Sequence, residues 1–187
     1  MMVLVTGGAS SGKSAYAEQV ALGLPAPHFY LATMKPYGEE AARRIERHRS
    51  LRAGKGFVTV ECYEGLKAAA LTMRNEVAAA GTEGGTALLE CLGNAVANEL
   101  FSDDGTCACA DDALASVLDG VEALACSVDC LVIVGNEVGG DGIPYDGDTR
   151  TYQQVIGAAA CALAQRCDAV VECIAGQPML VKGSLPS

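Results

Sequence analysis

The sequence predicts an α/β fold in which a mostly parallel sheet is covered by helices on both of its faces. Short apolar runs alternate along the chain with segments of helical composition. The apolar runs are continuous rather than alternating, as in strands that are buried on both sides. The last two runs are separated only by Ala175-Gly176-Gln177. Because a parallel crossover needs many more residues, we expect this final pair to form an antiparallel hairpin at one edge.

Each predicted strand is a short apolar run bounded by glycine or polar residues. The strands are Met2–Thr6, His28–Ala32, Phe57–Glu61, Thr86–Glu90, Asp129–Gly135, Ala169–Ile174 and Pro178–Val181. The predicted helices are Lys13–Leu22, Glu39–Arg52, Glu64–Ala80, Gly93–Phe101, Cys107–Ala125 and Thr151–Gln165. The Gly- and Asp-rich stretch Gly139–Asp148 is predicted to be a mobile loop. No linker or repeat interrupts this order, so we expect one domain over residues 1–187.

The composition is that of an acidic chain with a large apolar fraction. It has 187 residues, a net charge of −10 and 50% hydrophobic residues, an apolar fraction that excludes disorder. No run approaches the roughly 18 apolar residues of a membrane span, and the start MMVLVTGG does not resemble a secretory leader. We therefore expect a cytoplasmic protein without membrane insertion. The negative charge also disfavours binding to nucleic acid or to anionic membranes.

Nine cysteines raise the question of a disulfide framework or a metal site. Their number is odd and no CxxC pair occurs. The closest pairs, Cys107 with Cys109 and Cys126 with Cys130, have neither a histidine nor a second cysteine pair nearby in the sequence to complete a zinc site. We expect small, buried, reduced residues. They are Cys62, Cys91, Cys107, Cys109, Cys126, Cys130, Cys161, Cys167 and Cys173.

A glycine-rich segment between the first predicted strand and the first predicted helix fits the phosphate-loop pattern GxxxxGK[ST]. Glycines let the backbone curl so that its N–H groups point at phosphate oxygens, and the helix start adds its positive dipole end. This predicts a phosphate-loop NTPase-like three-layer domain that binds a nucleoside triphosphate, with Lys13 on the outer phosphates and Ser14 on Mg²⁺. The segment comprises Gly7, Gly8, Ala9, Ser10, Ser11, Gly12, Lys13 and Ser14.

A carboxylate that shares the Mg²⁺ with Ser14 is expected at the end of another buried strand, because ligands bind at the carboxyl ends of parallel strands. Two residues qualify. Glu90 ends the run TALLE, and Glu137 follows the run DCLVIVG and Asn136. Either side chain could instead be an acidic group at a helix N-terminus, where negative charge is also favourable.

A basic segment, Arg43–Lys55, contains six of the thirteen Lys and Arg residues, whereas none lies between Asn75 and Thr149. The segment includes RIERHRSLR, in which His48 is one of only two histidines. A neutral imidazole is a good nucleophile toward phosphorus, and arginines neutralise polyphosphates. The alternative is a solvated helix face on which His48 has no catalytic part. The other histidine, His28, is interpreted as structural.

Four blocks together resemble the bifunctional adenosylcobinamide kinase / adenosylcobinamide-phosphate guanylyltransferase family of cobalamin biosynthesis. They are LVTGGASSGKSAYAE, RIERHRSLR followed by FVTVE, LLECLGNAVANELF, and VIVGNEVGGDGIP, in the family's order. They extend from the first strand to residue 144. The resemblance implies phosphorylation of adenosylcobinamide with ATP or GTP, followed by transfer of GMP from GTP through a histidine to adenosylcobinamide phosphate. It also implies a homotrimer that binds the corrinoid between subunits.

The resemblance also assigns roles to individual residues. The match to RIxxH makes His48 the histidine that carries GMP. It implies that Glu61 and Glu90 contact the guanylyl donor or its Mg²⁺. Two further segments are expected at the nucleotide. They are Ala32, Thr33 and Met34 after the second strand, and Arg49, Ser50, Leu51 and Arg52 after the histidine.

Three features depart from the family pattern. Ser10 replaces the arginine of the usual loop GGxRSGKS, Phe57 replaces a tryptophan, and Asp141–Asp148 is unusually acidic. The first could change nucleotide affinity or the balance between the two activities. Two alternative functions therefore stay open, a phosphate-loop kinase of small molecules without a covalent step and a non-catalytic nucleotide-binding protein.

Overall fold

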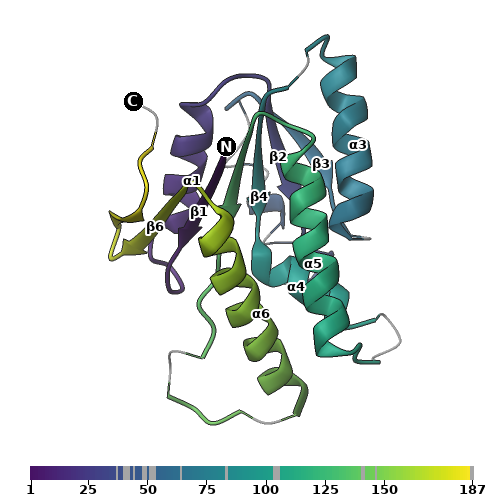
Figure 1. Ribbon diagram of the computed structural model, residues 1–187, viewed down its shortest axis with the longest axis vertical. Coiled ribbons are helices and arrows are strands. Elements are labelled where there is room, and N and C mark those ends of the chain that lie inside the picture. The colour runs from purple at the N-terminus through teal and green to yellow at the C-terminus, as the bar shows by residue number, and fades with distance from the viewer. Residues whose placement is uncertain are drawn as a thin grey trace.

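The computed structural model describes residues 1–36, 38–39, 43, 45–47, 50, 54–63, 65–82, 84–102, 106–139, 142–145 and 147–185. The strands in these ranges are β1 (Met2–Thr6), β2 (His28–Ala32), β3 (Phe57–Glu61), β4 (Thr86–Glu90), β5 (Cys130–Val134), β6 (Ala169–Ile174) and β7 (Gln177–Lys182). The helices are α1 (Lys13–Leu22), α3 (Leu66–Ala79), α4 (Leu92–Leu100), α5 (Ala110–Ala125) and α6 (Gly147–Arg166). Figure 1 shows how they are arranged.

The strands form one sheet in the order β3-β2-β4-β5-β1-β6-β7. All neighbouring pairs are parallel except β6 and β7, which are antiparallel. Ala175 and Gly176 join that last pair with φ values of 49° and 80°, as in the tight turns that suit hairpins. The predicted α/β fold, its mostly parallel sheet and its antiparallel C-terminal edge are thus confirmed.

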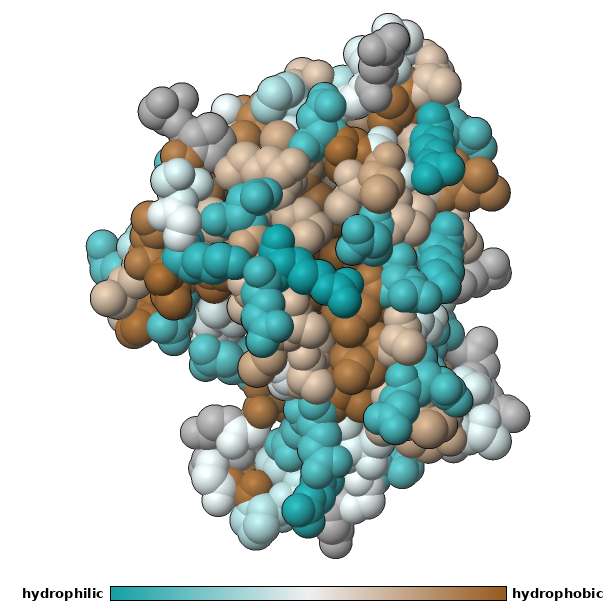
Figure 2. Space-filling view, viewed as in Figure 1, coloured by the Kyte–Doolittle hydropathy of each residue, from teal (hydrophilic) through white to brown (hydrophobic). Residues whose placement is uncertain are grey.

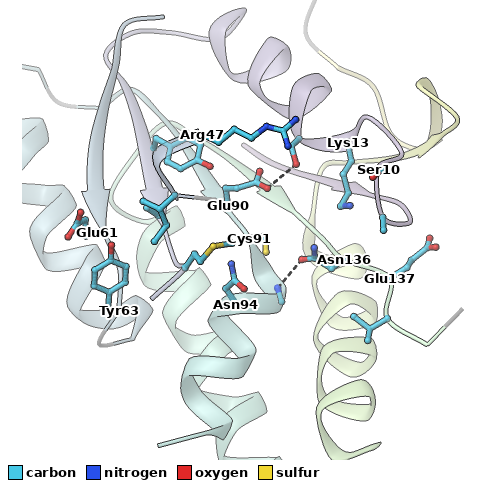
Figure 3. A pocket seen from close by; sticks show the side chains of 18 of the residues that line it. Ser10, Lys13, Arg47, Glu61, Tyr63, Glu90, Cys91, Asn94, Asn136 and Glu137 are labelled. Atoms are coloured by element: carbon cyan, nitrogen blue, oxygen red, sulfur yellow. Dashed lines mark hydrogen bonds between the residues drawn. The ribbon is translucent and has the colours of Figure 1, made fainter. Parts of the chain in front are cut away.

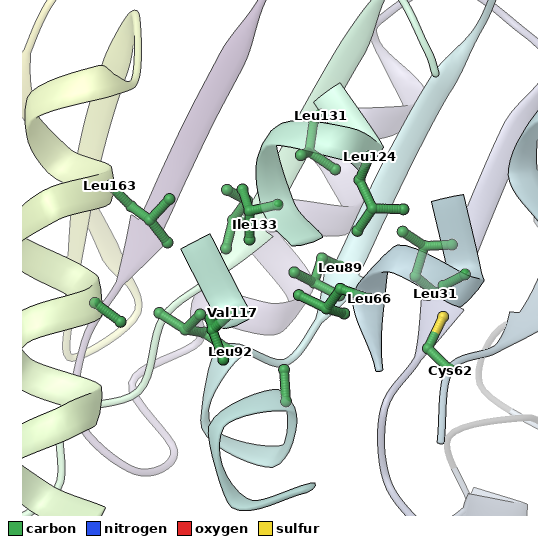
Figure 4. Packing of buried hydrophobic residues seen from close by; sticks show 14 of the residues in the cluster. Leu31, Cys62, Leu66, Leu89, Leu92, Val117, Leu124, Leu131, Ile133 and Leu163 are labelled. Carbon is green, nitrogen blue, oxygen red and sulfur yellow. The ribbon is translucent and has the colours of Figure 1, made fainter. Parts of the chain in front are cut away.

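Helices cover the sheet on both faces. The sheet therefore separates two layers of buried hydrophobic residues. One face of the sheet, with Leu31, Leu89 and Ile133, packs against α3, α4, α5 and α6 (Figure 4). The other face, with Val5 and Val132, packs against α1. Both faces of β4 and β5 are buried, and the three central residues of β4 and all five residues of β5 are accordingly apolar. Glu90, the last residue of β4, lies at the carboxyl end of the sheet, where the site is found.

The structure differs from the predicted elements at several boundaries. Helix α6 begins at Gly147, so the prediction of a loop through Asp148 is wrong at its last two residues. An acidic side chain in a first helical turn interacts favourably with the helix dipole, and Asp148 lies in that position. Helix α5 begins at Ala110 because Cys107 instead pairs with Phe101 in an isolated bridge. Residues 39, 43, 45–47 and 50 of the predicted helix Glu39–Arg52 are helical.

Five of the nine cysteines are buried and four are exposed, so the expectation of burial holds for only five. Burial raises the pKa of the Cys62 thiol to about 12 and that of Cys167 to about 11. Such thiols stay protonated at neutral pH and are poor nucleophiles. In the part of the chain that the structure describes, no helix is both long enough and apolar enough to cross a membrane.

Candidate functional site

The glycine-rich loop runs from the end of β1 to the start of α1, as its pattern predicts. Gly7 has a φ of 146°, and a Cβ atom there would lie 2.5 Å from the carbonyl oxygen of Cys173. Only glycine fits this position. Ser11 N–H donates to the Gly8 carbonyl at 3.3 Å, and Gly176 N–H donates to the Ser11 carbonyl at 2.9 Å. The loop is therefore held both by its own turn and by the β6–β7 hairpin.

Lys13 lies inside this loop rather than on its surface. Its side chain is buried, and Nζ donates to the Gly8 carbonyl oxygen at 2.9 Å. A buried ammonium group needs oxygen partners. The charge is therefore held at the position from which a phosphate-loop lysine reaches the outer phosphates of a nucleotide.

Ser14 and Glu90 form the second part of the site. The Ser14 hydroxyl donates to Glu90 Oε1 at 2.9 Å, from the first turn of α1 to the last residue of β4 (Figure 3). Of the two carboxylates that the sequence left open, Glu90 is thus the one beside the serine. A hydroxyl and a carboxylate are hard oxygen donors of the kind that Mg²⁺ prefers.

Thr33 ties the end of β2 to the residues that follow β4. Its Oγ1 accepts from Cys91 N–H at 2.7 Å and lies within donating distance of the Glu90 and Cys91 carbonyls, at 2.9 and 3.0 Å. Asn98 of α4 donates to the Thr33 carbonyl at 2.9 Å. The Thr33 side chain is fully buried. It therefore lies beneath the site and supports Glu90.

A cavity of about 520 Å³ opens beside the loop, a volume typical of small-molecule sites. In Figure 3 the phosphate loop lies at one end, Glu61 and Tyr63 lie at the other, and Glu90 and Cys91 lie between them. The lining residues are Ala9, Ser10, Lys13, Ser14, Tyr30, Ala32, Met34, Ile45, Arg47, Thr59, Glu61, Tyr63, Glu90, Cys91, Gly93, Asn94, Asn136, Glu137, Val138 and Tyr152.

Nine residues that the sequence proposed for the nucleotide or the metal line this cavity, namely Ala9, Ser10, Lys13, Ser14, Ala32, Met34, Glu61, Glu90 and Glu137. Gly7, Gly8, Ser11 and Gly12 form the backbone of the loop and do not line it. Thr33 is buried below, and Ser50 is exposed outside the lining. His48, Arg49, Leu51 and Arg52 lie outside the described residues.

The basic segment reaches the cavity through two of its described residues, Ile45 and Arg47. Both are helical. At the far end of the segment Lys55 Nζ donates to Glu18 Oε2 of α1 at 2.5 Å. The segment thus contacts the helix that follows the phosphate loop, and Arg47 adds a second cation to a cavity that already holds Lys13.

Several lining residues were missed because they are far apart in the sequence. Tyr30 and Thr59 are opposite each other in the β2–β3 register, and they share a face with Ala32 and Glu61, two residues further along each strand. Because side chains alternate between the two faces of a strand, Tyr30 and Thr59 could have been predicted from the positions of Ala32 and Glu61. Nothing local marks Tyr152, which comes from α6.

The first turn of α4 is held by neighbours from two other elements. Asn136 Oδ1 accepts from Gly93 N–H at 3.1 Å, and the Tyr152 hydroxyl donates to the Gly93 carbonyl at 3.2 Å. Burial raises the pKa of Tyr152 to about 12. Burial and the neighbouring Glu90 raise the pKa of Cys91 to about 11. Both groups are therefore neutral at physiological pH and act as packing and hydrogen-bonding groups.

The strand–loop–helix unit, with its lysine and its serine–carboxylate pair, defines the phosphate-loop class of α/β domains. Residues 3–181 match the family described as cobinamide kinase / cobinamide phosphate guanyltransferase. The chain belongs to this family, whose members are enzymes.

Individual relatives agree with this assignment over nearly their whole length. The chain is 35% identical to the bifunctional adenosylcobalamin biosynthesis protein CobP of Pseudomonas aeruginosa, over 98% of each chain. It is 32% identical to CobU of Escherichia coli and 29% identical to CobU of Salmonella typhimurium, both described as bifunctional adenosylcobalamin biosynthesis proteins. These matches cover 97% of this chain and 100% of each relative.

Proposed function

We propose that this protein phosphorylates adenosylcobinamide with ATP or GTP and then transfers GMP from GTP to adenosylcobinamide phosphate. The products are adenosylcobinamide-GDP and pyrophosphate. The observation that carries the proposal is the phosphate loop with Lys13, Ser14 and Glu90 at one end of a cavity large enough for a nucleotide. The family and the names of the relatives supply the substrate class.

The nucleotide binds with its phosphates in the loop and its nucleoside toward Glu61. Backbone N–H groups from Gly8 to Ser14 and the Lys13 ammonium neutralise the phosphates. Ser14 and Glu90 would hold Mg²⁺, and their oxygen atoms fit that ion when phosphates and water complete the shell. Bound there, Mg²⁺ would neutralise charge that develops on the phosphate oxygens. Ala32 and Met34 line the wall between the two ends.

His48 is proposed to carry GMP between the two substrates. Its ring nitrogen bonds to the α-phosphorus of GTP as the bond from that phosphorus to the bridging oxygen breaks and pyrophosphate leaves. A phosphate oxygen of adenosylcobinamide phosphate then bonds to the same phosphorus, and the P–N bond breaks. The position of Arg47 in the cavity supports this role for the neighbouring residue. Arg49, Ser50, Leu51 and Arg52 are proposed to contact the nucleotide.

We also propose a cytoplasmic homotrimer of one-domain subunits that binds the corrinoid between subunits. Strand β7 supports self-association, because it is an edge strand exposed along its whole length. Met179, Leu180 and Val181 are more than half exposed, and such apolar edges favour association. In Figure 2 hydrophobic residues gather at the left, where Figure 1 shows the β6–β7 hairpin. The oligomeric state can be measured by light scattering and sedimentation. A monomer at micromolar concentration would contradict the proposed homotrimer.

GTP labelled at the α-phosphate, incubated with the protein but without corrinoid, tests the covalent step. We expect a protein-bound label that is stable in alkali, labile in acid and absent from His48→Ala. Formation of adenosylcobinamide phosphate from adenosylcobinamide tests the kinase step. Kinase activity without label would identify a kinase of small molecules without a covalent intermediate, and binding without either reaction would identify a non-catalytic protein.

A further inference from the structure

A second acidic side chain, Glu137, lies beside the phosphate loop and has no part in the arrangement described so far. It follows β5, which is paired directly with β1. A Cβ atom added to Gly8 would lie 3.9 Å from Glu137 Oε2, an ordinary van der Waals distance, so the carboxylate faces this part of the loop. In Figure 3 Glu90 and Glu137 lie on opposite sides of Lys13. The loop is thus flanked by two carboxylates, only one of which is bonded to Ser14.

The proximity of Glu137 to Gly8 places its carboxylate at the end of the loop where we expect the outer phosphates. Lys13 Nζ donates to the carbonyl of that same glycine, and the lysine of a phosphate loop reaches the β- and γ-phosphates. The Ser14–Glu90 pair marks the other side, where Mg²⁺ is expected. A carboxylate next to the γ-phosphate and apart from the metal pair lies where an acceptor hydroxyl must approach.

The backbone that carries Glu137 is held in place, whereas its side chain is open to the cavity and to solvent. Gly135 N–H donates to the Val5 carbonyl at 2.8 Å, and Asn136 accepts from Gly93. The Glu137 side chain is exposed and lines the cavity. A proton that it accepts can therefore pass directly to water.

We propose that Glu137 is the catalytic base of the phosphorylation step, an inference that rests on the proposed function. The carboxylate takes the proton of the acceptor hydroxyl while that oxygen bonds to the γ-phosphorus. The bond from the γ-phosphorus to the bridging oxygen breaks, the nucleoside diphosphate leaves, and Glu137 releases the proton to solvent. An alcohol is a weak nucleophile until it loses its proton, so a positioned carboxylate accelerates this step.

Guanylyl transfer does not need this base. Its nucleophiles are the lone pair of a neutral imidazole and an oxygen of a phosphate that is already ionised. Neither has to lose a proton in order to attack, and the bond changes occur at the α-phosphorus. Glu137 should therefore separate the two activities, whereas Lys13 and Glu90, which act on the nucleotide itself, serve both.

Two assays on the full-length protein test the proposal. The first follows conversion of adenosylcobinamide and ATP to adenosylcobinamide phosphate, and the second starts from adenosylcobinamide phosphate and GTP. For Glu137→Gln we expect kcat of the first reaction to fall about 10²- to 10⁴-fold. The kcat of the second reaction should stay within about threefold of the wild-type value. Glu137→Asp should restore part of the first activity. Glu122→Gln, an exposed acid on α5, is the matched control and should leave both unchanged.

Three results would overturn the proposal. Equal loss of both activities would show a general effect on folding or nucleotide binding. Unchanged kcat with a lower KM for ATP would show that Glu137 only repels the phosphates. A wild-type protein that phosphorylates nothing would overturn the proposed kinase function together with this role, and the wild-type assay alone distinguishes that failure from the other two.

Discussion

The two ends of the cavity are built in different ways. At the phosphate-loop end Lys13 is buried, Ser14 is paired with Glu90, and Thr33 supports the strand end from below. At the other end Thr59 and Glu61 project from β3, an edge strand with exposed positions. Phosphoryl chemistry needs charges held in one geometry, whereas binding of a nucleoside tolerates more movement. The difference indicates which substitutions should affect kcat and which should affect KM.

Loss of the lysine should have the largest effect. Lys13→Ala removes the ammonium group that bonds to the Gly8 carbonyl inside the loop, and we expect kcat/KM of both reactions to fall about 10³-fold, within the range for removal of a group that stabilises transition-state charge. Lys67→Ala is the control, because Lys67 is an exposed lysine of α3 paired with Asp119 at 2.9 Å. Steady-state kinetics measure both, and a Lys13→Ala protein within tenfold of wild type would contradict the assignment.

Loss of the Thr33 hydroxyl should disturb the same end indirectly. Thr33→Val keeps the volume but leaves the Cys91 N–H and two carbonyls without this partner. We expect a loss of about 1–3 kcal/mol in the free energy of unfolding, the usual cost of buried polar groups that lose a partner. Because Glu90 is then less well held, kcat should fall in both reactions.

Urea denaturation provides the comparison between the two ends. Thr59→Val makes the same chemical change on the exposed edge strand, and its free energy of unfolding should stay within about 0.5 kcal/mol of the wild type. If Thr33→Val and Thr59→Val lowered the free energy of unfolding equally, the two ends of the cavity would not differ in how firmly they are held.

Removal of the carboxylate at the far end should change binding rather than chemistry. For Glu61→Gln we expect KM for GTP to rise about tenfold, which is about 1.4 kcal/mol, with kcat nearly unchanged. The control is the unfolding midpoint, which should not move because the side chain is exposed. A fall in kcat with constant KM would place Glu61 in the chemical step instead.

The smallest effect concerns the pH dependence of stability. Burial raises the pKa of Cys91 to about 11 in the folded protein, whereas an unfolded thiol titrates near its ordinary value. The folded state then keeps a proton that the unfolded state releases, so stability falls as pH rises from about 9 to 11. Urea midpoints between pH 7 and 10.5 measure the decline, which should be shallower in Cys91→Ala than in Cys161→Ala, where the thiol is exposed.

Much of the fold could be predicted because its signals are local. Each parallel strand is a continuous apolar run, and the short connection before β7 excludes a parallel crossover. The element boundaries that were predicted wrongly depend on tertiary contacts. Cys107, for example, pairs with Phe101 in an isolated bridge and does not extend α5. Propensity cannot anticipate such a bridge, because the partner comes from a different element.

The sequence by itself determined the phosphate loop, because the chemistry of that site is contained in one contiguous segment from Gly7 to Ser14. The cavity around it combines residues from strands and helices that are far apart in the sequence, and only the tertiary structure decided which of them meet. It brought Glu90 to Ser14, left Glu137 beside Gly8, and placed Thr33 beneath the site. The physical reason is that strand order is set by the packing of the whole sheet. Two carboxylates that look equivalent along the chain thereby come to lie on opposite sides of the same lysine.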